Sequence, residues 1–119
     1  MAQDNRHILV FGATGQVATE LQHQAIVTAL GRDAADLSYP DACFAAIETH
    51  KPDLVINAAA WTAVDAAEEH AAQAHVINAD APGAMARACA AREIPFCHIS
   101  TDYVFDGSGT EPWRETDPV

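Results

Sequence analysis

The chain has 119 residues, 50% hydrophobic and 19% charged, which is typical of a single globular domain. Its 17 acidic and 6 basic residues give a formal net charge of −11, which disfavours binding to nucleic acid or to anionic membranes. No apolar stretch has the ~18–20 residues of a membrane-spanning helix, and residues 1–6 lack the apolar core of a signal peptide. Three cysteines without a C-x-x-C pair predict reduced, mostly buried thiols. We therefore expect a cytoplasmic protein.

Apolar runs rich in β-branched residues alternate with helical patterns, and this alternation predicts strands between helices. In chain order we expect a strand at 7–11, a helix at 16–24, a strand at 26–30, a helix at 40–50, a strand at 54–57, a helix at 65–93 and a strand at 96–100. Pro40 suits a first helical turn. In the third helix, a notch at 78–83 is expected, with Asn78 capping the second half that Pro82 starts. The segment after Thr101 is rich in glycine and proline and predicts a loop.

This alternation predicts an α/β fold in which parallel strands are covered by helices on both faces. Because crossovers between parallel strands are right-handed, the expected architecture is a doubly wound, Rossmann-like sheet with strand order 3-2-1-4. Ligands of such sheets bind at the carboxyl ends of the strands, around the switch point. His98, inside the fourth strand, is expected to be buried.

A glycine-rich turn, Gly12-Ala13-Thr14-Gly15-Gln16-Val17-Ala18, follows the first strand and opens the first helix. In this context the turn predicts dinucleotide binding. Gly12 permits a tight turn, and Gly15 lets the backbone approach a pyrophosphate. The amides of Gly15, Gln16 and Val17 are expected to point at that anion from the helix N-terminus. The alternative is a turn that only links a strand to a helix.

The residue closing the second strand is expected to meet the adenosine ribose, where arginine favours a 2′-phosphate and an acidic residue favours a free hydroxyl. The chain has Gly31-Arg32-Asp33 there. Arg32 favours NADP over NAD, whereas Asp33 leaves NAD open. Asp36 and Leu37 are candidates for flanking the adenine, with a plain turn before Pro40 as the alternative.

Three motifs occur in a characteristic order: Gly12-x-x-Gly15-Gln16-Val17, then Asn57-Ala58-Ala59-Ala60-Trp61-Thr62-Ala63-Val64-Asp65, then Ser100-Thr101-Asp102-Tyr103-Val104-Phe105-Asp106-Gly107. Together they resemble the dTDP-4-dehydrorhamnose reductases, which are extended short-chain dehydrogenases/reductases. The resemblance covers essentially the whole chain, and its last motif is the most specific. It implies NAD(P)H-dependent reduction of the C4 ketone of dTDP-4-dehydro-L-rhamnose to dTDP-L-rhamnose, for cell-surface polysaccharide.

The resemblance also implies roles for individual residues. Thr101 looks like the catalytic hydroxyl, and Thr101, Asp102 and Tyr103 are expected to contact the substrate. Glu20 matches a position that contributes to a magnesium site at the dimer interface of some members, and a solvent-facing glutamate is the alternative. With the turn and Arg32 included, the expected cofactor contacts are Gly12, Thr14, Gly15, Gln16, Val17, Arg32, Asp36, Leu37, Ala58, Ala59, Ala60, Trp61 and Thr62.

The chain departs from the family pattern in its proton donor. Members of the family use a tyrosine followed four residues later by a lysine. The only tyrosines here are Tyr39 and Tyr103 and the only lysine is Lys51, so the pair is absent. We therefore expect Val119 to be a truncation, residues 1–119 to form the N-terminal half of the NAD(P)-binding domain, and the chain alone to be inactive.

Two further functions stay open, and so does the oligomeric state. The chain could be a non-catalytic NADP-binding regulatory subunit of the same fold, against which Thr101 argues. It could also be another nucleotide-sugar epimerase or dehydratase, against which the run 102–107 argues. The fourth strand is expected to lack the strand that would cover its free edge, and this exposed edge predicts self-association with a second copy, as in a homodimer, or poor solubility.

Overall fold

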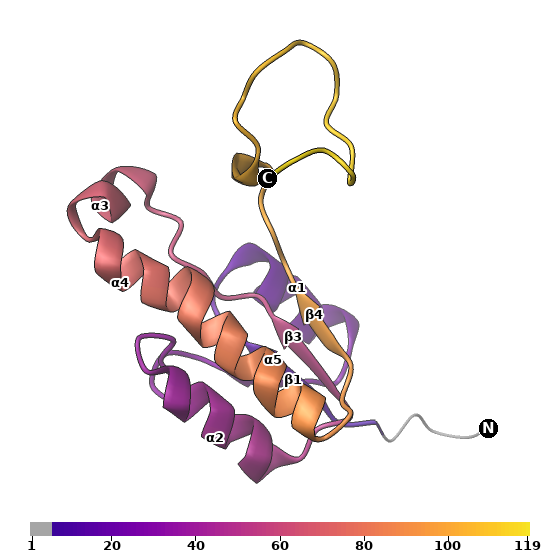
Figure 1. Ribbon diagram of the computed structural model, residues 1–119. Helices are drawn as coiled ribbons and strands as arrows, with labels where there is room; N and C mark the ends of the chain where they lie inside the picture. Colours follow the sequence, from indigo (N-terminus) through magenta and orange to yellow (C-terminus); the bar gives the residue numbers. More distant parts are fainter. Residues whose placement is uncertain (1–5) are drawn as a thin grey trace.

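The computed structural model describes residues 6–119, apart from the side chain of Asp102, and its strands form one parallel sheet flanked by helices (Figure 1). In chain order the elements are β1 (Ile8–Phe11), α1 (Gln16–Gln24), β2 (Thr28–Leu30), α2 (Pro40–His50), β3 (Leu54–Asn57), α3 (Val64–Glu69), α4 (Ala71–His75), the π-helix η1 (Val76–Asp80), α5 (Ala81–Ala91), β4 (Phe96–His98) and the 3₁₀ turn η2 (Asp102–Val104). Within these residues, no helix is both long enough and apolar enough to cross a membrane.

The order of the strands is β2-β1-β3-β4, and every neighbouring pair is parallel. This confirms the doubly wound α/β class. The sheet is consistent with the expected order 3-2-1-4, in which β2 flanks β1 on one side. On the far side of β1, β3 takes the place that this order gives to a fourth strand. The switch point therefore lies between β1 and β3.

The helices form two layers, with α1 behind the sheet and α2 and α5 packed together in front of it (Figure 1). The main core lies between the sheet and the front layer. Its fully buried side chains include Leu9, Phe11, Cys43, Ile47, Val55 and Met85. On the other side, Ala18 is the buried residue of α1, and its small side chain lets that helix lie close to its neighbours.

The helical region after β3 does not break where the sequence predicts a notch. Its break lies at His70, between α3 and α4, and not in the 78–83 stretch. Residues 76–80 continue the helix as a π-turn, in which the N–H of Ala81 donates to the carbonyl of Val76, five residues back. Pro82 lacks an N–H but lies in the first turn of α5, where that N–H is not needed.

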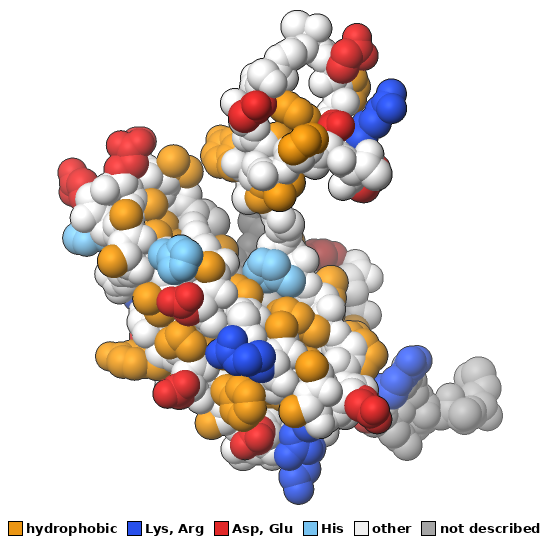
Figure 2. Space-filling view, in the orientation of Figure 1, with side chains coloured by type: hydrophobic (Ala, Val, Ile, Leu, Met, Phe, Trp, Pro, Cys, Tyr) orange, Lys and Arg blue, Asp and Glu red, His pale blue; other side chains and the backbone are white. Residues whose placement is uncertain are grey.

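The residues after Ser100 form a lobe that stands apart from the sheet and its helices (Figure 2). Inside it the rings of Phe105 and Trp113 stack, with centroids 4.6 Å apart and planes at 2°. The N–H of Ser108 donates to Asp106 Oδ1 at 2.9 Å. Trp113 therefore stabilises this loop through a contact within the loop, with Phe105.

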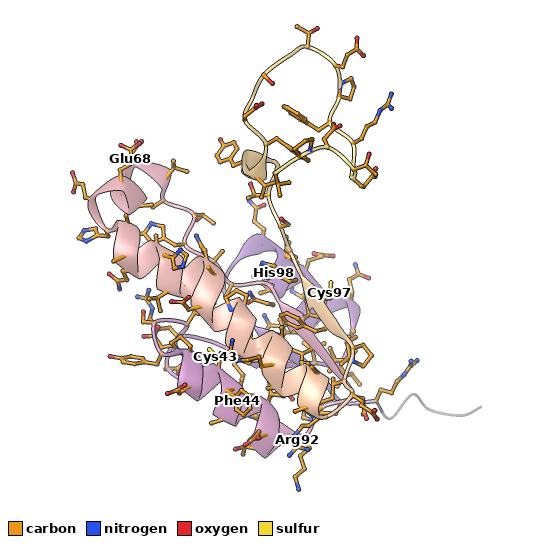
Figure 3. The ribbon with its side chains drawn as sticks, in the orientation of Figure 1. Cys43, Phe44, Glu68, Arg92, Cys97 and His98 are labelled. Carbon is orange, nitrogen blue, oxygen red and sulfur yellow. The ribbon has the colours of Figure 1, made fainter. Side chains whose placement is uncertain are left out.

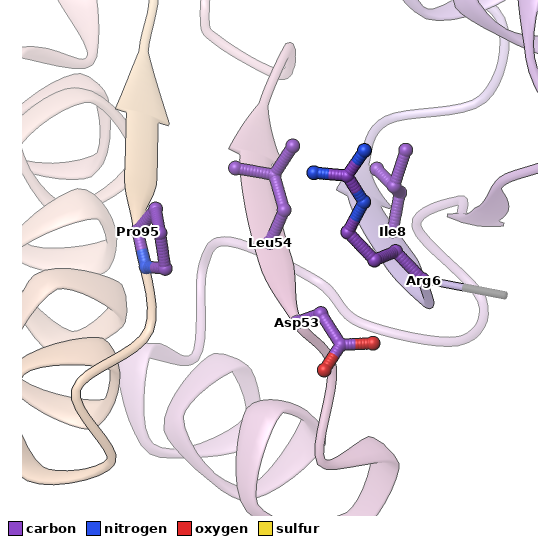
Figure 4. Close-up of a pocket in the computed structure, with 5 residues that line it drawn as sticks. All are labelled: Arg6, Ile8, Asp53, Leu54 and Pro95. Carbon is purple, nitrogen blue, oxygen red and sulfur yellow. The ribbon is translucent and has the colours of Figure 1, made fainter. Parts of the chain in front are cut away.

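The structure has hollows at both ends of the strands. The smaller, of 280 Å³, lies at their amino ends and is lined by Arg6, Ile8, Asp53, Leu54 and Pro95 (Figure 4). The Asp53 carboxylate there accepts the His7 N–H at 2.7 Å. Because parallel α/β sheets bind ligands at the carboxyl ends of their strands, the larger hollow at that opposite end is the candidate site.

Candidate functional site

A cleft of 1800 Å³ lies at the carboxyl ends of the four strands. Each strand contributes the segment that follows it, and the π-helix contributes one wall. The segments that line the cleft are 12–17, 29–37, 57–64 and 98–101, joined by Ala67, Ile77, Asn78, Tyr103 and Val104. The structure thus brings every cofactor residue expected from the sequence to one place, together with Thr101 and Tyr103. The side chain of Asp102 lies outside what the structure describes.

Gly12 makes the turn at the end of β1, and only glycine fits there. Its φ is +108°, which residues with a side chain rarely adopt. A Cβ on Gly12 would lie 3.3 Å from both the carbonyl carbon and the oxygen of Ala58. The Gly12 N–H donates to the Leu30 carbonyl at 2.8 Å. The turn therefore packs directly on the segment that leaves β3.

The N-terminus of α1 opens into the cleft without a side-chain cap. Gly15 is the N-cap residue, makes no side-chain hydrogen bond, and no acidic residue occupies the first turn. Amides at such a terminus, with the positive end of the helix dipole, favour an anion. Gln22 holds this turn from behind, since its Nε2 donates to the carbonyls of Ala13 at 2.9 Å and Ala18 at 3.0 Å. Sequence reasoning missed this role of Gln22.

The segment after β2 forms the far end of the cleft. Arg32 and Asp33 are exposed there. Asp36 Oδ1 accepts the N–H of Ser38 at 2.8 Å, so its carboxylate shapes the turn before α2. Leu37 is 7% exposed and belongs to the main core, so most of its surface packs inward although its edge lines the cleft.

Asn78 fixes the wall that follows β3. The N–H of Trp61 donates to Asn78 Oδ1 at 2.8 Å, and Asn78 Nδ2 donates to the Trp61 carbonyl at 3.1 Å. The indole N–H of Trp61 donates to the Ala63 carbonyl at 2.8 Å. The expected helix-capping role of Asn78 is wrong, because η1 and α5 have no side-chain cap. The π-turn instead directs Asn78 at the loop, a use found for π-turns at functional sites.

Thr101 lies at the opposite wall, past the end of β4, and is exposed. Its Oγ1 accepts the N–H of Tyr103 at 3.1 Å. A hydroxyl that accepts one hydrogen bond keeps its own proton for donation. Thr101 therefore both caps its turn and presents a donor to the cleft. The cleft also exposes large apolar side chains, namely Val17, Val64, Ile99, Tyr103 and Val104.

Glu20 lies outside the cleft, on an exposed part of α1. Its carboxylate accepts the Gln24 amide at 2.7 Å and lies 3.8 Å from His23 Nδ1. Among the side chains that the structure describes, which exclude that of Asp102, no three His, Cys, Asp or Glu residues gather to hold a metal ion. The structure therefore does not bring a set of magnesium ligands to Glu20.

The cysteines are free thiols that differ in exposure. Burial raises the pKa of Cys43 from 9.0 to about 11, and the charge of Asp36 adds to that shift. Burial also raises the pKa of Cys89. Cys43 and Cys89 are buried, as expected for most of the thiols, whereas Cys97 on β4 is exposed (Figure 3).

We expect one thiol per chain to react rapidly with a disulfide reagent at pH 8, because only Cys97 is accessible and the neutral Cys43 thiol is a poor nucleophile. Absorbance of the released thiolate measures this, and Cys97→Ser should remove the fast phase. Fast labelling of Cys43 in the folded protein would contradict its burial.

The raised pKa of Cys43 in the folded state also makes stability depend on pH. Its contribution to the free energy of unfolding is complete below pH 9 and is lost as the pH rises toward 11.

Comparison with known proteins agrees with this site. Residues 6–119 match the family described as the RmlD substrate binding domain. The chain is 50% identical over 116 residues to a dTDP-4-dehydrorhamnose reductase of Burkholderia thailandensis, which covers 94% of this chain and 39% of the relative. The chain therefore spans about two fifths of the length of that relative.

Solved structures show the same fold. The chain superposes on a dTDP-4-dehydrorhamnose reductase from Clostridium acetobutylicum with a TM-score of 0.86 and 39% identity, over 95% of this chain and 42% of that one. The corresponding protein from Bacillus anthracis, in complex with NADP, gives a TM-score of 0.88 and 28% identity, over 96% and 43%. With a family match over nearly its whole length, the chain belongs to the RmlD substrate binding domain family.

Proposed function

We propose that residues 1–119 form the N-terminal part of the NADPH-binding domain of a reductase that converts dTDP-4-dehydro-L-rhamnose into dTDP-L-rhamnose. The observation that carries this proposal is the uncapped N-terminus of α1 beside Gly12, in the same cleft as Thr101. The names of the relatives support the substrate, since the one from Burkholderia thailandensis is a dTDP-4-dehydrorhamnose reductase.

The residues around the turn fit a dinucleotide phosphate. No Cβ at Gly15 fills the approach to the helix, where the nearest atom to a Cβ would be the Ala58 oxygen at 4.0 Å. The amides of Gly15, Gln16 and Val17 would hold the pyrophosphate, and Arg32 would pair with a 2′-phosphate. The wall from Ala58 to Thr62 would line the nicotinamide side. When bound, NADPH supplies the hydride that reaches the C4 carbonyl carbon.

Thr101 would stabilise the negative charge that develops on the C4 oxygen as the hydride arrives. Its hydroxyl proton is available for donation, because Oγ1 receives the Tyr103 N–H rather than donating to it. A preplaced neutral donor lowers the barrier to this charge separation. The alcohol also needs a proton, and the chain has no tyrosine followed four residues later by lysine to give it.

Two measurements test the function. Calorimetric titration of the chain with NADPH should show micromolar binding, and turnover of dTDP-4-dehydro-L-rhamnose by the chain alone should stay at background. A longer protein that extends this sequence through a tyrosine–lysine pair should oxidise NADPH in the presence of that sugar. No turnover by such a protein, when it binds NADPH and is folded, would exclude the reductase.

We expect Arg32→Ala to weaken NADPH binding about tenfold while leaving NADH binding unchanged, because one charge-assisted contact to the 2′-phosphate is lost. Arg87→Ala is the matched control, since Arg87 is also an exposed arginine but does not line the cleft. Calorimetry with both cofactors measures the effect. An equal loss for NADPH and NADH contradicts a 2′-phosphate role and leaves NAD as the cofactor.

The proposal includes a homodimer and a cytoplasmic location. β4 is the last strand of the sheet, and its outer edge has backbone groups available for pairing with a second copy. Light scattering after size exclusion should therefore give at least twice the 12.6 kDa of one chain, and a monomer at high concentration contradicts it.

Three free thiols favour a reducing compartment. Magnesium at Glu20 stays a prediction, because its expected site needs a second copy.

A further inference from the structure

One buried polar side chain connects β3 and β4, the strands that are followed by the wall from Ala58 to Thr62 and by Thr101. Asn57, at the end of β3, is 1% exposed and lies directly opposite His98 at the end of β4 in the register of the sheet. Asn57 Nδ2 and His98 Nδ1 are 3.1 Å apart. The N–H of Ala59 donates to Asn57 Oδ1, also at 3.1 Å. One amide therefore connects β4 to the first residues of the cofactor wall.

The direction of these hydrogen bonds fixes the proton on His98. A backbone N–H only donates, so the Asn57 atom that faces Ala59 must be the oxygen, and the nitrogen must face the imidazole. That nitrogen also only donates. His98 Nδ1 must therefore be the acceptor, and the ring proton of the neutral imidazole lies on Nε2. The Phe96 ring, stacked on that of His98 with centroids 6.2 Å apart, supports this ring position.

We propose that His98 is a positioning residue of the cleft, acting as a neutral Nε2–H imidazole that holds Asn57 and, through it, the backbone of Ala59. This role goes beyond those expected from the sequence. His98 lies three residues before Thr101 and lines the same cleft (Figure 3). The hydrogen-bonded pair thus links the wall after β3 to the segment that carries the Thr101 hydroxyl. Its effect on cofactor binding rests on the proposed function, whereas its proton position does not.

Three substitutions of similar size separate the hydrogen bond from the bulk of the ring. His98→Asn places an oxygen two bonds from Cβ, as Nδ1 is, and keeps an acceptor for Asn57. His98→Gln moves the acceptor one bond further out, and His98→Leu removes it. We expect His98→Leu and His98→Gln to weaken NADPH binding about tenfold and His98→Asn to stay within about threefold of the wild type. Circular dichroism establishes that each variant is folded.

Nitrogen NMR of the imidazole rings tests the proton position without any ligand. The signal that His98→Asn removes identifies His98, and it should show an unprotonated Nδ1 and a protonated Nε2. In Asn57→Asp an oxygen replaces the donor, so the ring proton should move to Nδ1. A wild-type Nδ1–H ring, or a folded His98→Asn that binds NADPH as weakly as His98→Leu, overturns the proposal. A wild type that binds no NADPH yet shows the expected ring overturns the proposed function alone.

Discussion

Replacing Gly12 by alanine is expected to abolish detectable NADPH binding and to lower the free energy of unfolding by about 2–4 kcal/mol. The added Cβ meets the backbone of Ala58 at 3.3 Å while φ stays at +108°. Neither strand end can move away easily, because the Ala58 N–H donates to the Phe11 carbonyl at 2.9 Å. Urea unfolding followed by circular dichroism and calorimetric titration measure the two effects.

Gly109→Ala is the matched control for this change. Gly109 also has a positive φ, of +78°, but no atom lies within 4 Å of its Cβ position. The control therefore carries the conformational cost alone, about 1 kcal/mol, and NADPH binding should not change. If both variants lose the same stability and Gly12→Ala still binds NADPH, the close packing of the turn on Ala58 does not shape the site.

The helices with strong local signals could be predicted from the sequence to the residue. Pro40 marks the first residue of α2, and the turn at Gly15 marks the start of α1. Strands were less well bounded, because a strand ends where its partner does. Pairing between β1 and β2 begins at Leu9 and Thr28, so Ile26 lies outside the sheet at 97% exposure although its side chain suits a strand.

Some residues of the candidate site could likewise be predicted from the sequence, and others could not. Residues of contiguous motifs, such as the turn and the wall after β3, could be predicted, because their chemistry is local. The roles of Asn78 and His98 could not, since they come from hydrogen bonds whose partners the fold brings together, across 17 residues for Asn78 and Trp61 and 41 for Asn57 and His98. The prediction that His98 is buried was wrong, because His98 is the last residue of β4 and opens into the cleft rather than into the core.

The second large effect is expected at Asn78. Asn78→Ala removes both hydrogen bonds to the backbone of Trp61, so we expect a loss of about 1–2 kcal/mol in stability. We also expect at least about tenfold weaker NADPH binding, since the wall from Ala58 to Thr62 then has to be ordered when the ligand binds. Amide hydrogen exchange should become faster at Trp61, whose N–H loses its acceptor.

Asp80→Ala is the control within the same π-helix. Asp80 is also an exposed polar residue, and its carboxylate pairs only weakly with His75, at 3.6 Å between two exposed side chains. We expect that variant to keep wild-type exchange at Trp61 and wild-type NADPH affinity. Equal effects of the two substitutions would mean that the π-helix acts through its general stability. An effect confined to Asn78→Ala would mean that the π-turn supports NADPH binding because it directs the Asn78 amide at the wall of the cleft.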